Sequence, residues 1–188
     1  MTAQRSRTAA DLLVDCLETE GVEYVFSVPG EETMDILDAL SRSTAIRHVT
    51  TRHEQGAAFM ADVYGRLTGR AAVAMGTLGP GATNLVTGVA DAYLDRAPMV
   101  AITGQASSDK LHKEAHQVVD IVEMLRPVTK WNTRLEHVSA LPEIVRKAFR
   151  VATLSKPGPT HIEVPENVAG ASLAAHDALR PIQPGKAY

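Results

Sequence analysis

The sequence has little cysteine, no basic cluster and no long apolar run, and each absence excludes a class of protein. Cys16 is the only cysteine among 188 residues, so an internal disulfide is excluded and a reducing compartment is expected. The formal net charge is −3 without a block of Lys and Arg, so nothing indicates binding to nucleic acid or membranes. No apolar stretch is long enough for a membrane-spanning helix, and residues 1–8 lack the apolar core of a secretory signal. We therefore expect a cytoplasmic protein.

The remaining composition is that of a globular protein, with 45% apolar and 22% charged residues. Short strand-like segments alternate with helical patterns roughly six times, which predicts an α/β fold with a roughly six-stranded parallel sheet and helices on both faces. The expected strands cover residues 23–28, 46–50, 71–75, 98–103, 128–132 and 160–164. The expected helices cover residues 8–20, 31–40, 54–69, 82–94, 116–125 and 141–154. Met34 and Leu37 are expected to face the core, residues 106–115 to form an exposed loop, and 168–188 to be a linker or truncated tail after a domain at 1–167.

Glu54 stands where a predicted strand ends and a predicted helix begins, within Thr51-Arg52-His53-Glu54-Gln55-Gly56. In open α/β sheets this edge is where ligands bind. A carboxylate there is also stabilised by the partial positive charge of the helix N-terminus. From this pattern alone, the favoured interpretation is a first-turn acid that complements the helix dipole.

A glycine-rich loop, Gly76-Thr77-Leu78-Gly79-Pro80-Gly81-Ala82-Thr83-Asn84, joins another predicted strand to a helix. Glycines allow close approach of a ligand to the backbone, and the start of the helix offers unpaired N–H donors. The loop is not a Walker motif, because no Lys-Ser/Thr follows Gly81, and Asn84 breaks the dinucleotide fingerprint. A plain tight turn remains an alternative.

The histidines give no metal site. His53-Glu54 resembles the start of a zinc-protease helix, but Ala57 occupies the position of the second histidine. His112 and His116 have a metal-ligand spacing, yet no further His or Cys supports them, so a solvated pair is favoured.

Taken together, several blocks resemble the N-terminal, pyrimidine-binding domain of thiamine-diphosphate enzymes, and most of all the acetolactate synthases. The resemblance covers about Thr8 to Asn167. The blocks are Arg52-His53-Glu54-Gln55-Gly56, Gly65-Arg66, Gly79-Pro80-Gly81-Ala82-Thr83-Asn84-Leu85, Gly88-Val89-Ala90-Asp91-Ala92 and Ala101-Ile102-Thr103-Gly104-Gln105.

The resemblance implies a role for particular residues. Glu54 would hydrogen-bond the cofactor's aminopyrimidine ring and so promote deprotonation of its thiazolium carbon. Gln117 matches a glutamine near the substrate. The other residues implied to contact the cofactor are Pro29, Gly30, Thr77, Gly79 and Asn84. No metal ligand is implied in this chain.

Two residues depart from the usual pattern of acetolactate synthases. Glu31 stands where a second glycine follows the Pro-Gly turn, and His116 stands where Phe precedes the glutamine. The family's diphosphate and Mg²⁺ motif, Gly-Asp-Gly followed by an Asn, does not occur in this sequence. We therefore expect either the N-terminal part of a longer enzyme or a natural subunit that pairs with a diphosphate-binding chain. Alone it would be inactive, and in a full-length enzyme FAD is a further candidate cofactor.

For the assembled enzyme, the resemblance implies pyruvate or another 2-oxo acid as substrate, and a homodimer or a pairing with a diphosphate-binding domain. Three alternatives stay open. The chain could be a subunit of a thiamine-dependent 2-oxo acid decarboxylase, a non-catalytic module that binds a nucleotide or flavin at residues 76–84, or a purely structural interaction protein.

Overall fold

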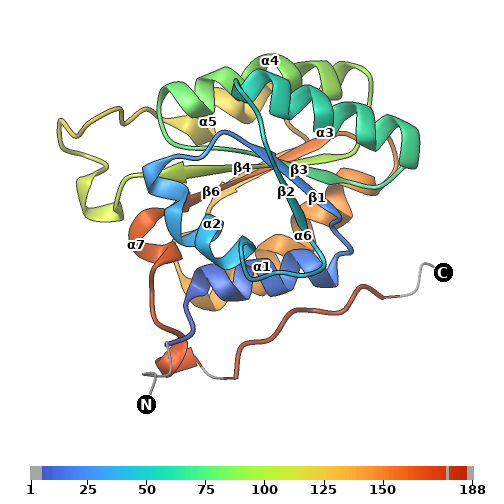
Figure 1. The fold of residues 1–188 in the computed structure, drawn as a ribbon. Helices are drawn as coiled ribbons and strands as arrows, with labels where there is room; N and C mark the ends of the chain where they lie inside the picture. Colours follow the sequence, from blue (N-terminus) through green and yellow to red (C-terminus); the bar gives the residue numbers. More distant parts are fainter. Residues whose placement is uncertain (1–5, 177, 186–188) are drawn as a thin grey trace.

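Six short strands form one parallel sheet (Figure 1). The structure, a computed structural model, describes residues 6–176 and 178–185. Every pair of neighbouring strands in this sheet is parallel, which confirms the predicted fold class. In spatial order the strands are β2 (Arg47–Thr50), β1 (Tyr24–Ser27), β3 (Ala72–Gly76), β4 (Met99–Gln105), β6 (Pro159–Pro165) and β5 (Trp131–Arg134).

Helices cover both faces of the sheet. One face carries α3 (Glu54–Thr68), α4 (Pro80–Leu94) and α5 (Ile121–Leu125), and the other carries α1 (Ala9–Thr19), α2 (Met34–Leu40) and α6 (Leu141–Thr153) (Figure 1). Short 3-10 segments are η1 (Glu31–Thr33), η2 (Ser108–Lys110), η3 (Arg126–Val128), η4 (Val138–Ala140) and η5 (Leu173–His176).

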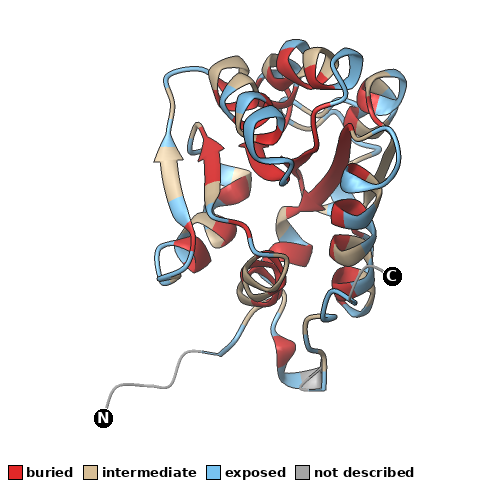
Figure 2. Cartoon of the chain, turned by 90° about the vertical axis from the view of Figure 1, so that its right-hand side faces the viewer, coloured by how far each residue is buried: buried red, intermediate tan, exposed pale blue. Residues whose placement is uncertain are grey.

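Burial on both faces explains the composition of the central strands. Val73 and Met75 of β3 pack into the core beneath α1, α2 and α6, while Ala72 and Ala74 pack beneath α3 and α4. A strand covered on both sides has no solvent-facing positions, so its sequence is a continuous apolar run. Figure 2 shows that buried residues follow the central strands and the inward sides of the helices.

The sheet has a topological switch point between β1 and β3. The chain leaves β1 toward α2 on one face, whereas it leaves β3 toward α4 on the opposite face. Loops that diverge in this way open a crevice at the carboxyl ends of the two strands, which is where open α/β sheets bind ligands.

Two predicted elements differ from the observed ones. The helix expected at 116–125 is only α5, because Gln117 adopts a left-handed backbone (φ 56°) and the Asp120 side chain caps a helix that starts at Ile121. The strand expected at 128–132 is β5, shifted toward the C-terminus, because residues 126–128 form a 3-10 turn.

The start of the helix predicted at 31–40 is also different. Its first turn is η1, and the α-helix begins at Met34. The tighter turn changes the orientation of the residues that follow, so Met34 is 60% exposed and the prediction that it faces the core was wrong. Ile36 occupies the core instead.

Beyond β6 the chain stays packed against the domain. Helix α7 (Glu166–Ala169) follows at once, and Leu173 is buried. The backbone N–H of Ala9 donates to the carbonyl of Ala171 at 2.8 Å. The boundary at residue 167 stays a prediction, and parts of the predicted segments 1–8 and 168–188 lie outside the described residues. No helix among those residues is both long and apolar enough to cross a membrane.

Candidate functional site

Three loops meet at the carboxyl edge of the sheet, beside the switch point. Pro29 and Gly30 follow β1, residues 51–53 follow β2 and lead into Glu54, and residues 77–79 follow β3. Because β1 pairs in parallel with both β2 and β3, these loops leave the sheet at the same edge. The fold therefore brings five of the predicted site residues to one place, and Asn84 joins them from the second turn of α4.

Glu54 is the first residue of α3 and is almost buried, with 8% of its surface exposed. His53 caps the helix, since its Nδ1 accepts a hydrogen bond from the backbone N–H of Gln55 at 3.1 Å. The side-chain amide of Asn84 donates to Glu54 Oε2 at 2.9 Å. No donor from the described part of the chain reaches Oε1 of Glu54, so this oxygen can accept a hydrogen bond from a ligand.

The glycine loop needs its glycines for two different reasons. Gly79 has a positive φ of 51°, and a Cβ there would lie 2.5 Å from the carbonyl oxygen of Gln117. A Cβ on Gly81 would lie 2.8 Å from Thr77 Cγ2 and 3.3 Å from Glu54 Oε1. The backbone of the loop therefore lies directly against the carboxyl group of Glu54, which goes beyond what a plain tight turn requires.

Thr77 is held between the glycine loop and the loop after β1. A Cβ on Gly30 would lie 2.5 Å from Thr77 Cβ, so the two segments touch. The Thr77 hydroxyl donates to Glu32 Oε2 at 2.6 Å. Sequence reasoning singled out Glu31, whose side chain is exposed, and missed Glu32. No local sequence signal marks Glu32, because the 3-10 turn that follows Gly30 in the structure decides which of the two adjacent acids faces inward.

Gln117 and His116 lie on an exposed loop between β4 and α5. The backbone of Gln117 contacts Gly79, while its side chain is open to solvent in this chain. His112 and His116 are both exposed as well. Within residues 6–176 and 178–185, no three His, Cys, Asp or Glu side chains are grouped closely enough to hold a metal ion.

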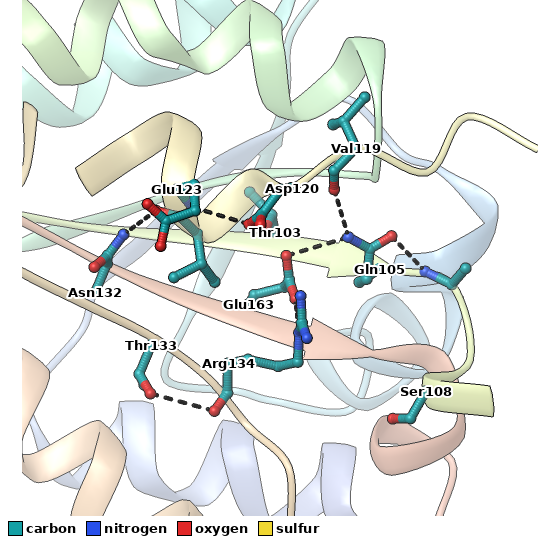
Figure 3. A network of polar contacts seen from close by, with 12 residues as sticks. Thr103, Gln105, Ser108, Val119, Asp120, Glu123, Asn132, Thr133, Arg134 and Glu163 are labelled. Atoms are coloured by element: carbon teal, nitrogen blue, oxygen red, sulfur yellow. Dashed lines mark hydrogen bonds and ion pairs between the residues drawn. The ribbon is translucent and has the colours of Figure 1, made fainter. Parts of the chain in front are cut away.

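A second polar cluster lies beneath α5, on β4, β5 and β6 (Figure 3). The fully buried Glu163 forms an ion pair with Arg134 and accepts a hydrogen bond from Gln105 at 3.2 Å. Gln105 also donates to the carbonyl of Val119 at 3.1 Å, which ties the loop before α5 to the sheet. Burial raises the pKa of Glu163, and the Arg134 guanidinium opposes that shift.

His161 lies two residues before Glu163 and is completely buried. Its Nε2 pairs with the Thr103 hydroxyl at 2.9 Å, and burial lowers the pKa of its imidazole to about 3. Sequence reasoning missed both residues. The signal was that His161 and Glu163 stand at alternate positions of one strand, so that both point to the same face of the sheet.

The helices that hold Glu54 and Asn84 are fastened to each other at their far ends. Arg66 of α3 forms ion pairs with Asp62, Asp91 and Asp95, the last two belonging to the end of α4 and its C-cap. A Cβ on Gly88 would lie 2.5 Å from Ala58 Cβ, so the two helices are in close contact. The Glu54–Asn84 contact is thus set by a rigid pair of helices.

Five cavities of about 320 to 860 Å³ lie on the described part of the chain, and Glu54 lines none of these five. The largest lies between α3 and the edge of β1 and β2, where its lining includes Phe26, Phe59, Met60 and Leu67.

Residues 7–124, more than half of the chain, match the family model described as "Thiamine pyrophosphate enzyme, N-terminal TPP binding domain". The matched range contains Glu54, the glycine loop, Asn84 and Gln117. The chain belongs to this family. The resemblance inferred from the sequence motifs is confirmed.

This thiamine pyrophosphate enzyme domain is similar to curated acetolactate synthases from several kingdoms. It is 48% identical over 162 residues to "Acetolactate synthase 3, chloroplastic" of Brassica napus, covering 86% of this chain and 25% of that protein. It is 44% identical over 168 residues to "Acetolactate synthase isozyme 1 large subunit" of Escherichia coli (strain K12), covering 89% and 30%. The "Probable acetolactate synthase large subunit" of Methanococcus aeolicus is 45% identical over 159 residues, covering 85% and 26%. The chain thus spans less than a third of the length of these relatives.

Proposed function

We propose that this chain binds the aminopyrimidine half of thiamine diphosphate and forms the N-terminal part of an acetolactate synthase-like enzyme. Such an enzyme decarboxylates a 2-oxo acid, with pyruvate as the first candidate, and joins the remaining acyl unit to an acceptor. The observation that supports this most is the pair Glu54 and Asn84 at the switch point, with Glu54 Oε1 free to accept a hydrogen bond.

The residues at this edge fit a flat heterocycle. Glu54 would share a proton with a ring nitrogen, and Asn84 would keep the carboxyl group oriented through Oε2. A Cβ on Gly30 or Gly81 would collide with Thr77, so glycine at both positions lets Thr77 pack between these two segments beside Glu54. Pro29, Thr77 and Gly79 would form the surrounding wall, and Gln117 would face the substrate. When bound, the cofactor would supply the electron sink for decarboxylation.

The other half of the cofactor needs residues that this part of the chain does not offer. Among the residues described, no cluster of potential metal ligands is available to hold Mg²⁺ beside a diphosphate. We infer that a second domain or a second chain closes the site, in a homodimer or in a pair with a diphosphate-binding subunit. FAD stays a candidate for the full-length enzyme. The cytoplasmic location stays a prediction, and the plant relatives are named as chloroplastic proteins.

The role of Glu54 is tested by Glu54→Gln in the full-length enzyme that contains this chain, or in the chain with its partner. The variant keeps the size of the side chain and an acceptor for Asn84, but loses the acid. We expect hydrogen–deuterium exchange at the cofactor's C2 carbon to slow by about 10² to 10⁴-fold. Glu143→Gln is the matched control, since Glu143 is also a first-turn helix acid but lies in α6, on the opposite face of the sheet. If exchange at C2 is equally fast in Glu54→Gln and Glu143→Gln, Glu54 does not activate the cofactor and only complements the helix dipole.

The principal rival is a non-catalytic module that binds a nucleotide or flavin at the glycine loop. Titration calorimetry of the same protein with thiamine diphosphate, FAD and ADP separates the two. Tight binding of ADP without a response to thiamine diphosphate would favour the rival. A decarboxylase subunit would bind thiamine diphosphate but release an aldehyde from pyruvate without carboligation. A structural protein would tolerate Glu54→Gln without any change in activity.

A further inference from the structure

A cationic cavity lies at the amino edge of the sheet, at the opposite end of the strands from Glu54. Its volume is about 460 Å³, and it is bounded by the end of α4, the residue before β5 and the turn before β6. Its lining contains the cations Arg96, Lys130 and Lys156, and no Asp or Glu is among the described residues that line it. The charge of this cavity therefore suits an anion.

Neighbouring strands bring the three cations together. Met99 of β4 pairs with Pro159 of β6. Arg96 stands three residues before the first of these partners, and Lys156 stands three residues before the second. Lys130 immediately precedes β5, and its backbone N–H donates to the carbonyl of Pro159 at 2.8 Å. Because β4, β6 and β5 are adjacent and parallel, all three cations lie at the same edge of the sheet.

Arg96 and Lys156 share an unusual backbone conformation. Their φ angles are 57° and 55°, and among the described residues only Gln117 is another non-glycine residue with a positive φ. The backbone N–H of Ala97 donates to the carbonyl of Ala92 at 2.8 Å, which is the bond of a Schellman motif. Glycine usually occupies the position that Arg96 has in this motif. Side chains are strained in the left-handed region, and such residues concentrate at functional sites, which favours a role for these two cations.

The cations have donors to offer a ligand. Arg96 and Lys156 are exposed, and within the described part of the chain neither side chain forms an ion pair or a hydrogen bond. Lys130 is half-buried and donates to the carbonyls of Val151 and Leu154 at the end of α6, the latter at 2.9 Å. An ammonium group has three N–H donors, so one is left for a ligand. Burial lowers the pKa of Lys130, and a bound anion would stabilise its charged form.

We propose that this cavity binds a phosphate group, either as free phosphate or as the phosphate of a small ester. Arg96 and Lys156 would donate to its oxygens from the turns before β4 and β6, and Lys130 would donate its third N–H. Three separate cations match a dianion with several acceptor oxygens better than they match a single carboxylate. The contacts of Lys130 with the last carbonyls of α6 also offset the partial negative charge of that helix end, which would repel an anion.

The same cavity has an apolar side. Tyr93 and Leu94, at the end of α4, line it and are 42% and 76% exposed. A flat apolar group attached to the phosphate could therefore lie against the Tyr93 ring. Since the cavity and Glu54 are at opposite edges of the sheet, this inference does not depend on the proposed function.

The test uses the full-length enzyme that contains this chain, with thiamine diphosphate and Mg²⁺ present so that the cofactor's own phosphate contacts are occupied. Titration calorimetry in chloride buffer uses inorganic phosphate and phenyl phosphate as probes. We expect saturable binding at one site per chain. Tighter binding of phenyl phosphate would identify an ester as the ligand, and equal or weaker binding of phenyl phosphate would identify free phosphate.

Arg96→Gly and Lys156→Gly remove the charges without straining the fold, because glycine adopts a positive φ readily. We expect each variant to weaken phosphate binding at least about tenfold and to keep or raise the thermal midpoint of unfolding. Arg96→Gln and Lys156→Gln keep a long side chain without the charge and should lose affinity to a similar extent. Lys113→Gln is the control, since Lys113 is an exposed cation on the loop after β4, at the opposite edge of the sheet.

The outcomes decide between a site and a general effect of charge. Absence of saturable binding to the folded wild type overturns the inference. Unchanged affinity in a folded protein that carries both Arg96→Gly and Lys156→Gly overturns it as well, and so does an equal loss in Lys113→Gln. Failure here with normal exchange at cofactor C2 leaves the proposed function intact, whereas absence of exchange with phosphate binding retained overturns only the proposed function.

Discussion

Glu163 and Arg134 form an unequal ion pair, and this inequality predicts which partner is more costly to remove. The side chain of Glu163 is fully buried, whereas that of Arg134 is 27% exposed. Arg134→Met leaves a buried carboxylate whose remaining side-chain donor is Gln105. Breaking a buried ion pair from one side costs about 3 to 5 kcal/mol. Since Gln105 still donates, we expect the free energy of unfolding at neutral pH to fall by about 3 kcal/mol.

The opposite change should be milder. Glu163→Gln puts a neutral amide into the buried position, and Arg134 can turn toward solvent because its side chain already reaches the surface. We expect a loss of about 1 kcal/mol, the usual net value of a hydrogen bond. The double variant should resemble Glu163→Gln, because no uncompensated charge then stays in the interior.

The dependence on pH gives an independent check. Burial raises the pKa of Glu163 and Arg134 lowers it, so removal of Arg134 raises the pKa further. A carboxyl group with a higher pKa in the folded than in the unfolded chain binds more protons when folded, and the folded state gains stability as pH falls. The loss caused by Arg134→Met should therefore shrink between neutral pH and about pH 5.

Urea denaturation of the wild type, both single variants and the double variant, at both pH values, measures these differences. A loss in Arg134→Met no larger than that in Glu163→Gln would refute the reasoning about the buried charge. So would a loss that does not change with pH.

Three further predictions follow from local geometry. Gly79 has a positive φ and its Cβ would meet a carbonyl oxygen, so Gly79→Ala should lower the free energy of unfolding by at least about 1 kcal/mol. Gly56 lies within α3 and its Cβ would meet open space, so Gly56→Ala should raise the free energy of unfolding by about 0.5 to 1 kcal/mol. Thermal denaturation of both variants compares the two effects. Burial raises the pKa of Cys16 to about 12, so its native thiol should react with a thiol reagent at neutral pH far more slowly than in the unfolded chain, and rapid labelling would contradict this. Arg66→Met leaves the buried Asp62 without its cation and should cost about 2 to 3 kcal/mol in urea denaturation, a loss that a surface pair would not produce.

The sequence indicates those features that depend on local chemistry. The alternation of strand-like segments with helical patterns predicts the parallel sheet. The position of Glu54 between a predicted strand and a predicted helix places it at the edge of that sheet. The glycine loop predicts a close backbone approach, and the structure puts Gly81 against Glu54. Asn84 lies thirty residues after Glu54, yet the family motif contains both and the fold joins them.

The features that the sequence does not reveal depend on contacts between distant segments or on the phase of a turn. Glu32 faces Thr77 because a 3-10 turn, not an α-helical one, follows Gly30, and the same turn exposes Met34. Glu163 finds its partners on β4 and β5, which no local pattern specifies. The missing start of the helix predicted at 116–125 follows from the left-handed backbone of Gln117, a residue type that carries no strong turn signal.

The ion pairs at the end of α3 have a consequence for the opposite end of the molecule. Arg66 lies about 18 Å along the helix axis from Glu54, at 1.5 Å per residue. Since Arg66 holds the last turns of both helices, a splaying there would pivot about the contact between Ala58 and Gly88 and shift Glu54 relative to Asn84 by a smaller amount. Mutations of Arg66 would thus alter the contact between Glu54 and Asn84 while leaving every atom at the sheet edge chemically unchanged.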